Sequence, residues 1–179
     1  RRSSDLMISG NQLNGRYDFA EQISLISSGK LSNNAWLIAR DIIVNLAGDL
    51  TNTGVLTAQR NLTIELANHD LKNDATGELA AKNQLIIEQV NNLTNQGDLI
   101  WGSEPANRIT LAGNFANHHL ANGAGSLLLE GVNFSNAGQL AGGDQLALKF
   151  SDELTNQGTI FALGDLLLAA DLAIKNQAG

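Results

Sequence analysis

A short phrase returns along this sequence at a nearly constant interval, and few folds can accommodate such a period. Leu-Thr-Asn-Gln-Gly occurs at Leu93 to Gly97 and again at Leu154 to Gly158, and Leu50 to Gly54 differs from it at one position. Its core, an apolar residue followed two positions later by asparagine, begins at Leu31, Leu50, Leu71, Leu93, Phe115, Phe134, Leu154 and Ile174. Successive copies begin about 20 residues apart, a period typical of solenoid proteins.

A weaker copy precedes these. It begins at Leu13, with Gly15 in place of the asparagine, Tyr17 in place of the glycine and Phe19 at the second apolar position. With this copy included, the sequence predicts about nine units in one continuous domain over residues 1–179. We expect residues 1–30 to form a degenerate first unit or a partial cap, and residues 31–179 to form the regular repeats.

Apolar and polar residues alternate within each unit, and alternation with a period of two is the pattern of β-strands. The first strand contains the asparagine phrase, and the second follows the glycine, as in Val55 to Ala58, Leu99 to Trp101 and Thr159 to Ala162. The third carries two apolar residues one position apart. The predicted pairs are Ile23 and Leu25, Ile42 and Val44, Leu62 and Ile64, Leu85 and Ile87, Ile109 and Leu111, Leu127 and Leu129, Leu146 and Leu148, and Leu166 and Leu168. Each unit is therefore interpreted as three short strands.

A unit of about 20 residues broken by asparagine and glycine is too short for the paired helices of an α-solenoid, and the sequence lacks the LxxLxLxxN signature of leucine-rich repeats. The remaining architecture is an all-β parallel β-helix, or β-solenoid, in which each unit is one coil and equivalent residues stack about 4.8 Å apart. About nine such coils would form a rod about 40 Å long.

Stacking gives the repeated asparagine a structural role. An inward-turned asparagine at the same corner of every coil can donate its amide to a carbonyl of the neighbouring coil. We expect such a ladder from Asn33, Asn52, Asn73, Asn95, Asn117, Asn136, Asn156 and Asn176. The glycine that follows would supply a positive φ angle or a close approach of the chain, as predicted for Gly54, Gly77, Gly97, Gly138 and Gly158. Ala35 and His119 replace this glycine, so their coils should be locally irregular.

The composition argues against several functions. Because 18 Asp and Glu residues outnumber 11 Lys and Arg residues, the formal charge of −7 would repel nucleic acid. No apolar run of about 18 residues is present, so this segment is not expected to insert into a membrane. The absence of cysteine excludes disulfides and thiolate metal sites. Arg1 to Gly10 lack the apolar core of a secretory signal, so we expect either a cytosolic protein or an internal piece of a longer one.

The segment LTNQGTIFALGDLLLAA, Leu154 to Ala170, resembles the haemagglutinin repeats of filamentous haemagglutinin and of the contact-dependent inhibition toxins, the large exoproteins of bacterial two-partner secretion. The resemblance extends over Leu31 to Gly179 and is faint over Leu6 to Lys30. It implies a right-handed parallel β-helix that forms the non-catalytic stalk of a secreted adhesin or toxin-delivery protein at the bacterial cell surface. It also implies an outer-membrane transporter as export partner and a host or target-cell receptor or glycan as binding partner.

Two other functions remain open from the residues alone: an extracellular enzyme that cuts acidic polysaccharide, and a glycan-binding adhesive module. The enzyme would need clustered carboxylates. The aspartates, however, fall at several different positions of the unit: Asp41, Asp49, Asp98, Asp144, Asp152, Asp165 and Asp171. An adhesive module would present exposed aromatic side chains, for which Trp36 and Trp101 are the candidates.

The pair His118 and His119 could begin a metal site. Adjacent residues in a strand point to opposite faces, however, and no third ligand recurs at a matching position, so neither a metal nor another cofactor is expected.

The longest interruption of the repeat is Trp101 to Arg108, which holds the chain's single proline. We expect it to form a loop that bulges from the rod, and irregular loops on a rigid scaffold are frequent binding sites. A second irregular segment runs from Asn117 to Ser126. Contact with a receptor or glycan is therefore expected at these two segments, with Trp101, Glu104, Arg108, His118 and His119 as the candidate residues.

Overall fold

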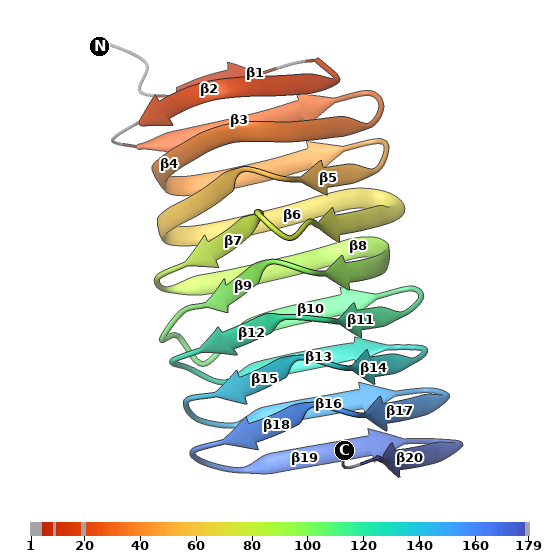
Figure 1. The fold of residues 1–179 in the computed structure, drawn as a ribbon. Coiled ribbons are helices and arrows are strands. Elements are labelled where there is room, and N and C mark those ends of the chain that lie inside the picture. Colours follow the sequence, from red (N-terminus) through yellow and green to blue (C-terminus); the bar gives the residue numbers. More distant parts are fainter. Residues whose placement is uncertain (1–4, 9, 19–20, 178–179) are drawn as a thin grey trace.

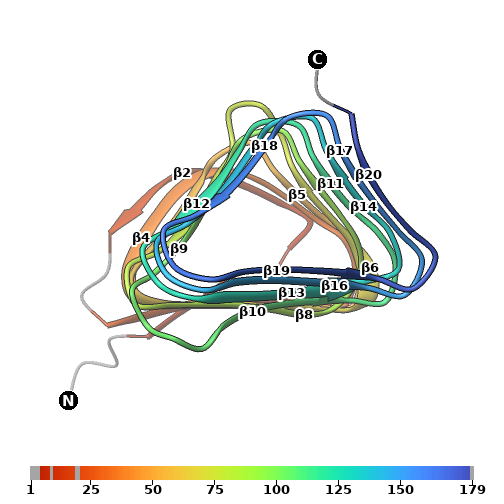
Figure 2. The same cartoon turned by 90° about the horizontal axis from the view of Figure 1, so that it is seen from below.

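The computed structural model describes residues 5–8, 10–18 and 21–177, and this part of the chain forms an all-β parallel β-helix that contains no helix. Twenty strands belong to one continuous sheet that winds around a common axis, and every pairing in it is parallel. The coils stack as a rod (Figure 1). Figure 2, seen from the C-terminal end, shows a triangular cross-section and a chain that winds with a right-handed sense.

The three sides of the triangle are three columns of stacked strands, here called sides A, B and C. Side A carries the apolar pairs and contains β1 (Asp5–Ile8), β3 (Gln22–Ser27), β10 (Asn107–Leu111), β13 (Leu127–Gly131), β16 (Leu146–Phe150) and β19 (Leu166–Ala170). Side B carries the asparagines and contains β5 (Leu50–Asn52), β11 (Phe115–Asn117), β14 (Phe134–Asn136), β17 (Glu153–Asn156) and β20 (Ala173–Asn176). Side C contains β7 (Glu78–Ala81), β9 (Asp98–Trp101), β12 (Leu120–Gly123), β15 (Gln139–Gly142) and β18 (Thr159–Ala162).

Four longer strands continue around corners and contribute to more than one side: β2 (Gln12–Asp18), β4 (Leu31–Leu46), β6 (Val55–Asn73) and β8 (Gln84–Asn95). The repeated phrases stack in register, as Phe115 pairs with Leu93 on one side and with Phe134 on the other. The described residues complete about eight turns of about 20 residues each. The predicted nine coils exceed this by one, because nine stacked rungs enclose only eight complete turns.

The interior is a set of aliphatic columns. Burial alternates residue by residue along both arms of β4, as a strand with one face toward a core requires, and the alternation is interrupted only at the corner formed by Arg40 and Asp41. The rungs of the apolar pairs, such as Ile42 and Val44 or Leu85 and Ile87, are fully buried. Each buried side chain of this size contributes about 1.5–3 kcal/mol of hydrophobic stabilisation. In the last turn the inward residues are more exposed, because no later coil covers them within the described chain.

The buried aromatic residues Trp101, Phe115, Phe134 and Phe150 lie in the C-terminal half of the core, whereas Tyr17 packs against the N-terminal part and is only partly buried. The rings of Phe115 and Phe134 are tilted by 44° with their centroids 5.4 Å apart, and those of Phe134 and Phe150 are stacked with their centroids 5.3 Å apart. All three rings are buried, so they join three consecutive turns by contacts that the aliphatic N-terminal turns lack.

The predicted copy at Leu13 is displaced by two residues in the structure. Leu13 pairs with Asn33, so it occupies the asparagine position, and Tyr17 pairs with Leu37 at the second apolar position. A shift of two residues keeps every side chain on the same face of a strand, so alternation alone cannot detect it. Phe19, predicted for the second apolar position, lies outside the described residues.

The same displacement affects the predicted pair Ile109 and Leu111. Ile109 pairs with Ile87 and Leu129, the second members of their pairs. The first position of this coil is therefore held by Asn107, which pairs with Leu127. Because Asn107 is polar, the search for two apolar residues one position apart selected Ile109 and Leu111 instead of the true pair of positions, 107 and 109.

Candidate functional site

The repeated asparagines lie in one column inside side B. Each Nδ2 donates to the Oδ1 of the next asparagine along the rod, over distances of 2.7–2.9 Å, from Asn33 through to Asn176. We call this column the inner ladder. Its first six members, Asn33, Asn52, Asn73, Asn95, Asn117 and Asn136, are buried, Asn156 is partly buried, and Asn176 is exposed at the last turn. The seven bonds thus link eight consecutive rungs without a break.

The inner ladder also satisfies backbone groups at the corner between sides B and C. Nδ2 of Asn73 donates to the carbonyl of Asp98 at 2.9 Å, and Nδ2 of Asn95 donates to that of Leu120 at 2.9 Å. Within the described residues, no buried side-chain nitrogen or oxygen lacks a hydrogen-bond partner. A carbonyl at a buried bend would otherwise lose its bond to water, which is costly, so the ladder stabilises the bend as well as the stacking.

A second column of polar side chains runs along the outside of the rod, and the sequence reading missed it. In this column, a side-chain Oδ1 atom accepts a hydrogen bond from the backbone N–H of the equivalent residue one turn later. The accepting residues are Asp49, Asp70, Asn92, Asn114 and Asn133, and the last of them accepts from the N–H of Glu153. These five bonds measure 2.9–3.2 Å. We call this column the outer ladder. Its sequence signal is an Asp or Asn directly before the apolar residue of the five phrases that begin at Leu50, Leu71, Leu93, Phe115 and Phe134.

The five turn glycines lie where successive coils approach most closely. None of them has a positive φ angle, so the left-handed conformation offered as one explanation is wrong for these positions. A Cβ atom on Gly158 would collide with the carbonyl oxygen of Gly138, and one on Gly138 with that of His119. Gly54, Gly77 and Gly97 face backbone of the preceding turn in the same way. Close approach of the chain is therefore the reason for glycine at this corner.

Local irregularity was expected at the two corners where Ala35 and His119 replace the glycine, and it is found at Ala35 but not at His119. At Ala35, β4 continues through the corner as an unbroken strand. At His119 the chain bends as in neighbouring coils, and Leu120 keeps its register with Asp98 and Gln139.

Trp101 is not an exposed contact residue, contrary to the interpretation of its loop. It is 1% exposed, and Nε1 donates to the carbonyl of Gly125 at 3.0 Å. The following turn has Gly123 beside it, where a Cβ would overlap the indole ring. Trp101 points inward because it stands at the position of Ala58 and Ala81 in earlier coils, and a large apolar ring gains more from burial than a small loop residue.

The loop after Trp101 does bulge from the rod, as Figure 2 shows. Its anchor is Asn107, which is 1% exposed. Nδ2 of Asn107 donates to the carbonyls of Gly102, Glu104 and Ser126, and Oδ1 accepts the N–H of Leu85 at 2.8 Å. Sequence reasoning missed this residue, although a single Asn at a position otherwise held by Leu or Ile was a usable signal.

The remaining loop residues lie on the surface and are dispersed. Glu104, His118 and His119 are exposed, and Arg108 pairs with Glu88 across one turn at 2.7 Å. Nε2 of His119 lies 3.5 Å from Oδ1 of Asp98. Among the described residues no group of three His, Cys, Asp or Glu side chains converges as metal ligands. These side chains therefore do not form one site.

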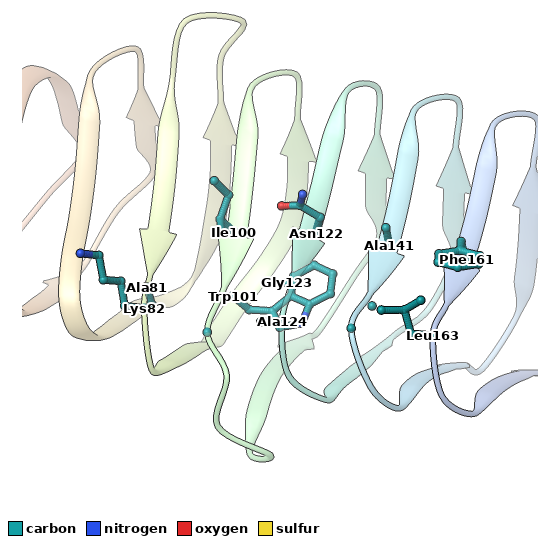
Figure 3. Close-up of a pocket in the computed structure, with 13 residues that line it drawn as sticks. Ala81, Lys82, Ile100, Trp101, Asn122, Gly123, Ala124, Ala141, Phe161 and Leu163 are labelled. Atoms are coloured by element: carbon teal, nitrogen blue, oxygen red, sulfur yellow. The ribbon is translucent and has the colours of Figure 1, made fainter.

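A groove of about 440 Å³ lies along the corner between sides C and A and adjoins both irregular segments (Figure 3). Its floor consists of small residues, among them Ala124, Ala141 and Gly143. Ile100 stands on one side of this floor and Phe161 and Leu163 on the other, three turns further along. Ile100, Asn122, Ala141 and Phe161 occupy equivalent outward positions in four successive turns. The smaller side chains between Ile100 and Phe161 leave a depression in the wall of the rod.

Several carboxylates of the described surface, among them Asp41, Asp70 and Glu88, take part in coil-to-coil contacts. Asp41 forms a two-point ion pair with Arg60, accepts the N–H of Asn61 at 3.3 Å and lies beside Arg40. Partial burial raises the pKa of Asp41, but the hydrogen bonds and charge of Arg60, together with Arg40, outweigh it and hold the pKa below its ordinary value. This carboxylate therefore links its own turn to the following one in its charged form.

A stretch of 124 residues, 68% of the chain, is 37% identical to part of a protein described as tRNA nuclease CdiA from Yersinia mollaretii. The chain spans about 4% of the length of that relative, so the likeness concerns a small portion of it. No family model and no solved structure matches the chain. The part of the chain that the structure describes has no helix long and apolar enough to cross a membrane. The likeness and the β-solenoid fold agree with the resemblance to contact-dependent inhibition exoproteins.

Proposed function

We propose that this chain is a segment of the non-catalytic stalk of a large secreted bacterial exoprotein, of the contact-dependent inhibition or filamentous-haemagglutinin type. The stalk would carry an adhesive or toxin domain away from the cell surface, after export through an outer-membrane transporter of two-partner secretion. Other parts of the parent protein, or its surface loops, would bind a receptor or glycan of the host or target cell.

The observation that carries this proposal is the unbroken inner ladder. A rod whose stability comes from contacts between neighbouring turns can be lengthened by adding turns, and each turn needs only its neighbour in order to fold. The seven consecutive bonds from Asn33 to Asn176 and the outer ladder provide such contacts at nearly every level. Length is then the property that the repeated sequence supplies.

The carboxylates give the enzyme alternative little support. Asp49 and Asp70 stand on successive turns beside Lys72, in a shallow groove of about 260 Å³. Oδ1 of Asp70, however, accepts three hydrogen bonds from Asn91 and Asn92, and Oδ1 of Asp49 accepts the N–H of Asp70. Carboxylates occupied in this way are suited to holding turns together rather than to proton transfer.

The proposal is tested by removing whole turns. Deleting residues 93–133 joins Asn92 to Phe134 and removes two complete turns, so both ladders can re-form in register. Deleting residues 93–123 removes one and a half turns and breaks the register. We expect the first variant to remain folded and to form a rod shorter by about 10 Å in small-angle scattering, since each turn rises about 4.8 Å.

The second variant should lose its cooperative unfolding transition. In the parent exoprotein, the in-register deletion should still allow display at the cell surface, detected with an antibody against a distal domain. Equal loss of display in both variants would contradict a stalk whose turns are interchangeable. Cleavage of an acidic polysaccharide such as polygalacturonate by the purified chain would contradict the non-catalytic assignment.

A further inference from the structure

Side A presents a column of aliphatic side chains on its outer face, which Figure 2 shows as the flat base of the triangle. From β3 to β19, the middle outward position of each rung is held in turn by Ser24, Ile43, Thr63, Ile86, Arg108, Leu128, Ala147 and Leu167. We call this the outer column of side A. The corresponding column of side B consists of Ser32, Thr51, Lys72, Thr94, Ala116, Ser135, Thr155 and Lys175. Four large aliphatic residues therefore face outward in this column of side A, and none in that of side B.

Polar side chains border the outer column on both sides. In β6, Asn61 and Glu65 flank Thr63, and at the level of β16, Gln145 and Lys149 lie on either side of the column. Alternate residues of a strand share one face, so the flanking side chains point outward together with the column. An apolar centre with a polar rim is the usual composition of a protein–protein interface.

The flanking groups at these two levels are available for contact with another molecule. Asn61 and Glu65 are partly exposed, and Gln145 and Lys149 are exposed. In the described part of the chain, none of these four side chains takes part in an ion pair or a side-chain hydrogen bond, since Asn61 and Gln145 bond only through their backbone. The amide, carboxylate and ammonium groups can therefore pair across an interface.

A second copy of the chain supplies complementary groups when the two rods are parallel. A two-fold axis parallel to the rods keeps every rung level, places the outer column against itself and places each flanking column against the opposite one. Asn61 then faces Glu65 of the second copy, and Gln145 faces Lys149 of the second copy. An amide donates to a carboxylate and accepts from an ammonium group, so both contacts are favourable.

The antiparallel arrangement of the same two faces is less favourable. A two-fold axis across the rods keeps each flanking column against itself and reverses the order of the rungs, so β6 faces β13 when the faces overlap fully. Glu65 would then lie against Glu130 of the second copy, and two like charges in an interface repel each other. In the parallel arrangement the charged residue that meets itself is Arg108, whose guanidinium is paired with Glu88 at 2.7 Å.

The size of side A matches a specific interface. Eight rungs about 4.8 Å apart, each about five residues wide, give roughly 600 Å² on each rod and roughly 1,200 Å² in total. This total lies at the lower limit of stable protein–protein interfaces. Two sheets that face each other pack about 10 Å apart, a gap that the Ile and Leu side chains of two outer columns fill.

We propose that two copies of this chain associate in parallel through side A, with their outer columns in contact. The contact is isologous, because the same surface is used on both rods, so it forms a closed dimer and not a filament. Both rods point in the same direction. This inference does not depend on the proposed stalk function.

The test uses position 63, which lies opposite itself in the proposed dimer. Thr63→Lys and Thr63→Glu each place two like charges against each other, whereas a mixture of the two variants places a cation against a carboxylate. Thr94→Lys and Thr94→Glu are the matched controls, because they make the same chemical changes in the corresponding column of side B. Circular dichroism and thermal unfolding establish that all four variants remain folded.

Sedimentation equilibrium over micromolar to millimolar concentration then measures the mass. We expect the unmodified chain and both Thr94 variants to form dimers, and each Thr63 variant alone to dimerise at least about tenfold more weakly. An equimolar mixture of Thr63→Lys and Thr63→Glu should regain dimerisation. This rescue is specific to the parallel arrangement, because residue 63 would face Leu128 in the antiparallel one. Asn61→Lys, which brings a cation to Glu65 of the second copy, should strengthen dimerisation, and Asn61→Asp should weaken it.

Three results would overturn the proposal. The unmodified chain could stay monomeric at millimolar concentration, or the Thr63 variants could associate as strongly as the Thr94 variants. In the second case association would arise elsewhere, for example at the exposed apolar residues Leu172 and Ile174 of the last turn. The mixture of the two Thr63 variants could also associate no more than either variant alone, which would exclude a contact in which position 63 meets itself.

Discussion

Replacing Asn95 with alanine would remove a rung from the middle of the inner ladder and leave buried acceptors without their donor. Nδ2 of Asn95 donates to Oδ1 of Asn117 and to the carbonyl of Leu120, both at 2.9 Å, and its Oδ1 accepts a bond from Asn73. Asn73 keeps a second acceptor at the carbonyl of Asp98, 2.9 Å away. The main loss therefore falls on the turn that follows Asn95.

The size of the effect follows from burial. A buried polar group left without a partner costs about 1–3 kcal/mol, so two orphaned acceptors at a fully buried rung should lower the free energy of unfolding by about 3–5 kcal/mol. For a chain of this length, that corresponds to a fall in Tm of roughly 10 °C. Asn176→Ala should cost less than about 1 kcal/mol, because Asn176 is exposed and water can replace its single ladder bond to Asn156.

The free energy of unfolding would be measured by urea titration followed by far-ultraviolet circular dichroism, with Tm from calorimetry. Thr94→Ala is the matched control, since Thr94 lies in the same strand but is not part of the inner ladder, and it should change stability by less than about 0.5 kcal/mol. If Asn95→Ala and Asn176→Ala were equally destabilising, burial of the ladder would not be its source of stability, and the reasoning would be refuted.

Gly138→Ala should destabilise the rod by about 1–3 kcal/mol in urea titration, because its Cβ would meet the backbone of the preceding turn, whereas Gly29→Ala has open space around it and should be neutral. Ala67→Gly should raise the free energy of unfolding by about 0.5–1 kcal/mol, because Ala67 has a φ of 48°, a left-handed conformation that glycine adopts at lower cost; an unchanged Tm would contradict this. The lowered pKa of Asp41 means that its ion pair with Arg60 stabilises the fold above the ordinary Asp range and that this contribution is lost as pH falls through the folded-state pKa. In acid titrations Asp41→Asn should therefore flatten the low-pH decline in stability relative to the unmodified chain.

The fold class follows from the sequence because the same constraint is repeated. One asparagine phrase would not identify a strand, but stacking requires that a residue at Asn95 meet its equivalents at Asn73 and Asn117, and the pairings have that register. A repeated pattern determines the spacing of the turns more firmly than local propensity does, because the other copies still define the period when one copy is misassigned. The predicted register is wrong at two degenerate copies, those of Leu13 and Ile109. A displacement by two residues keeps every side chain on the same face of the strand, so the pattern does not reveal it.

Surface features were harder to predict, because they depend on which atoms of neighbouring turns meet. Periodicity indicates which side chains point inward but not that Asp70 would accept the N–H of Asn92, so the outer ladder was missed. The interpretation of Trp101 as a contact residue assumed that an interruption of the repeat exposes its side chains. The interruption is instead absorbed by the buried amide of Asn107, which satisfies the carbonyls of the loop.

Departures from the repeat are compensated in the adjacent turn. Trp101 occupies an inward position where other coils have alanine, and the turn after it has Gly123 at the equivalent position and Ala121 where neighbouring coils have Leu99 and Leu140. Two smaller side chains thus make room for one larger ring, and the leucine column resumes at Leu140. Because each turn contacts only the turns before and after it, a change in volume has to be corrected within one period, and the rest of the rod keeps its geometry. A stacked rod can therefore accept a local irregularity such as the loop after Trp101 without altering the register of its other turns.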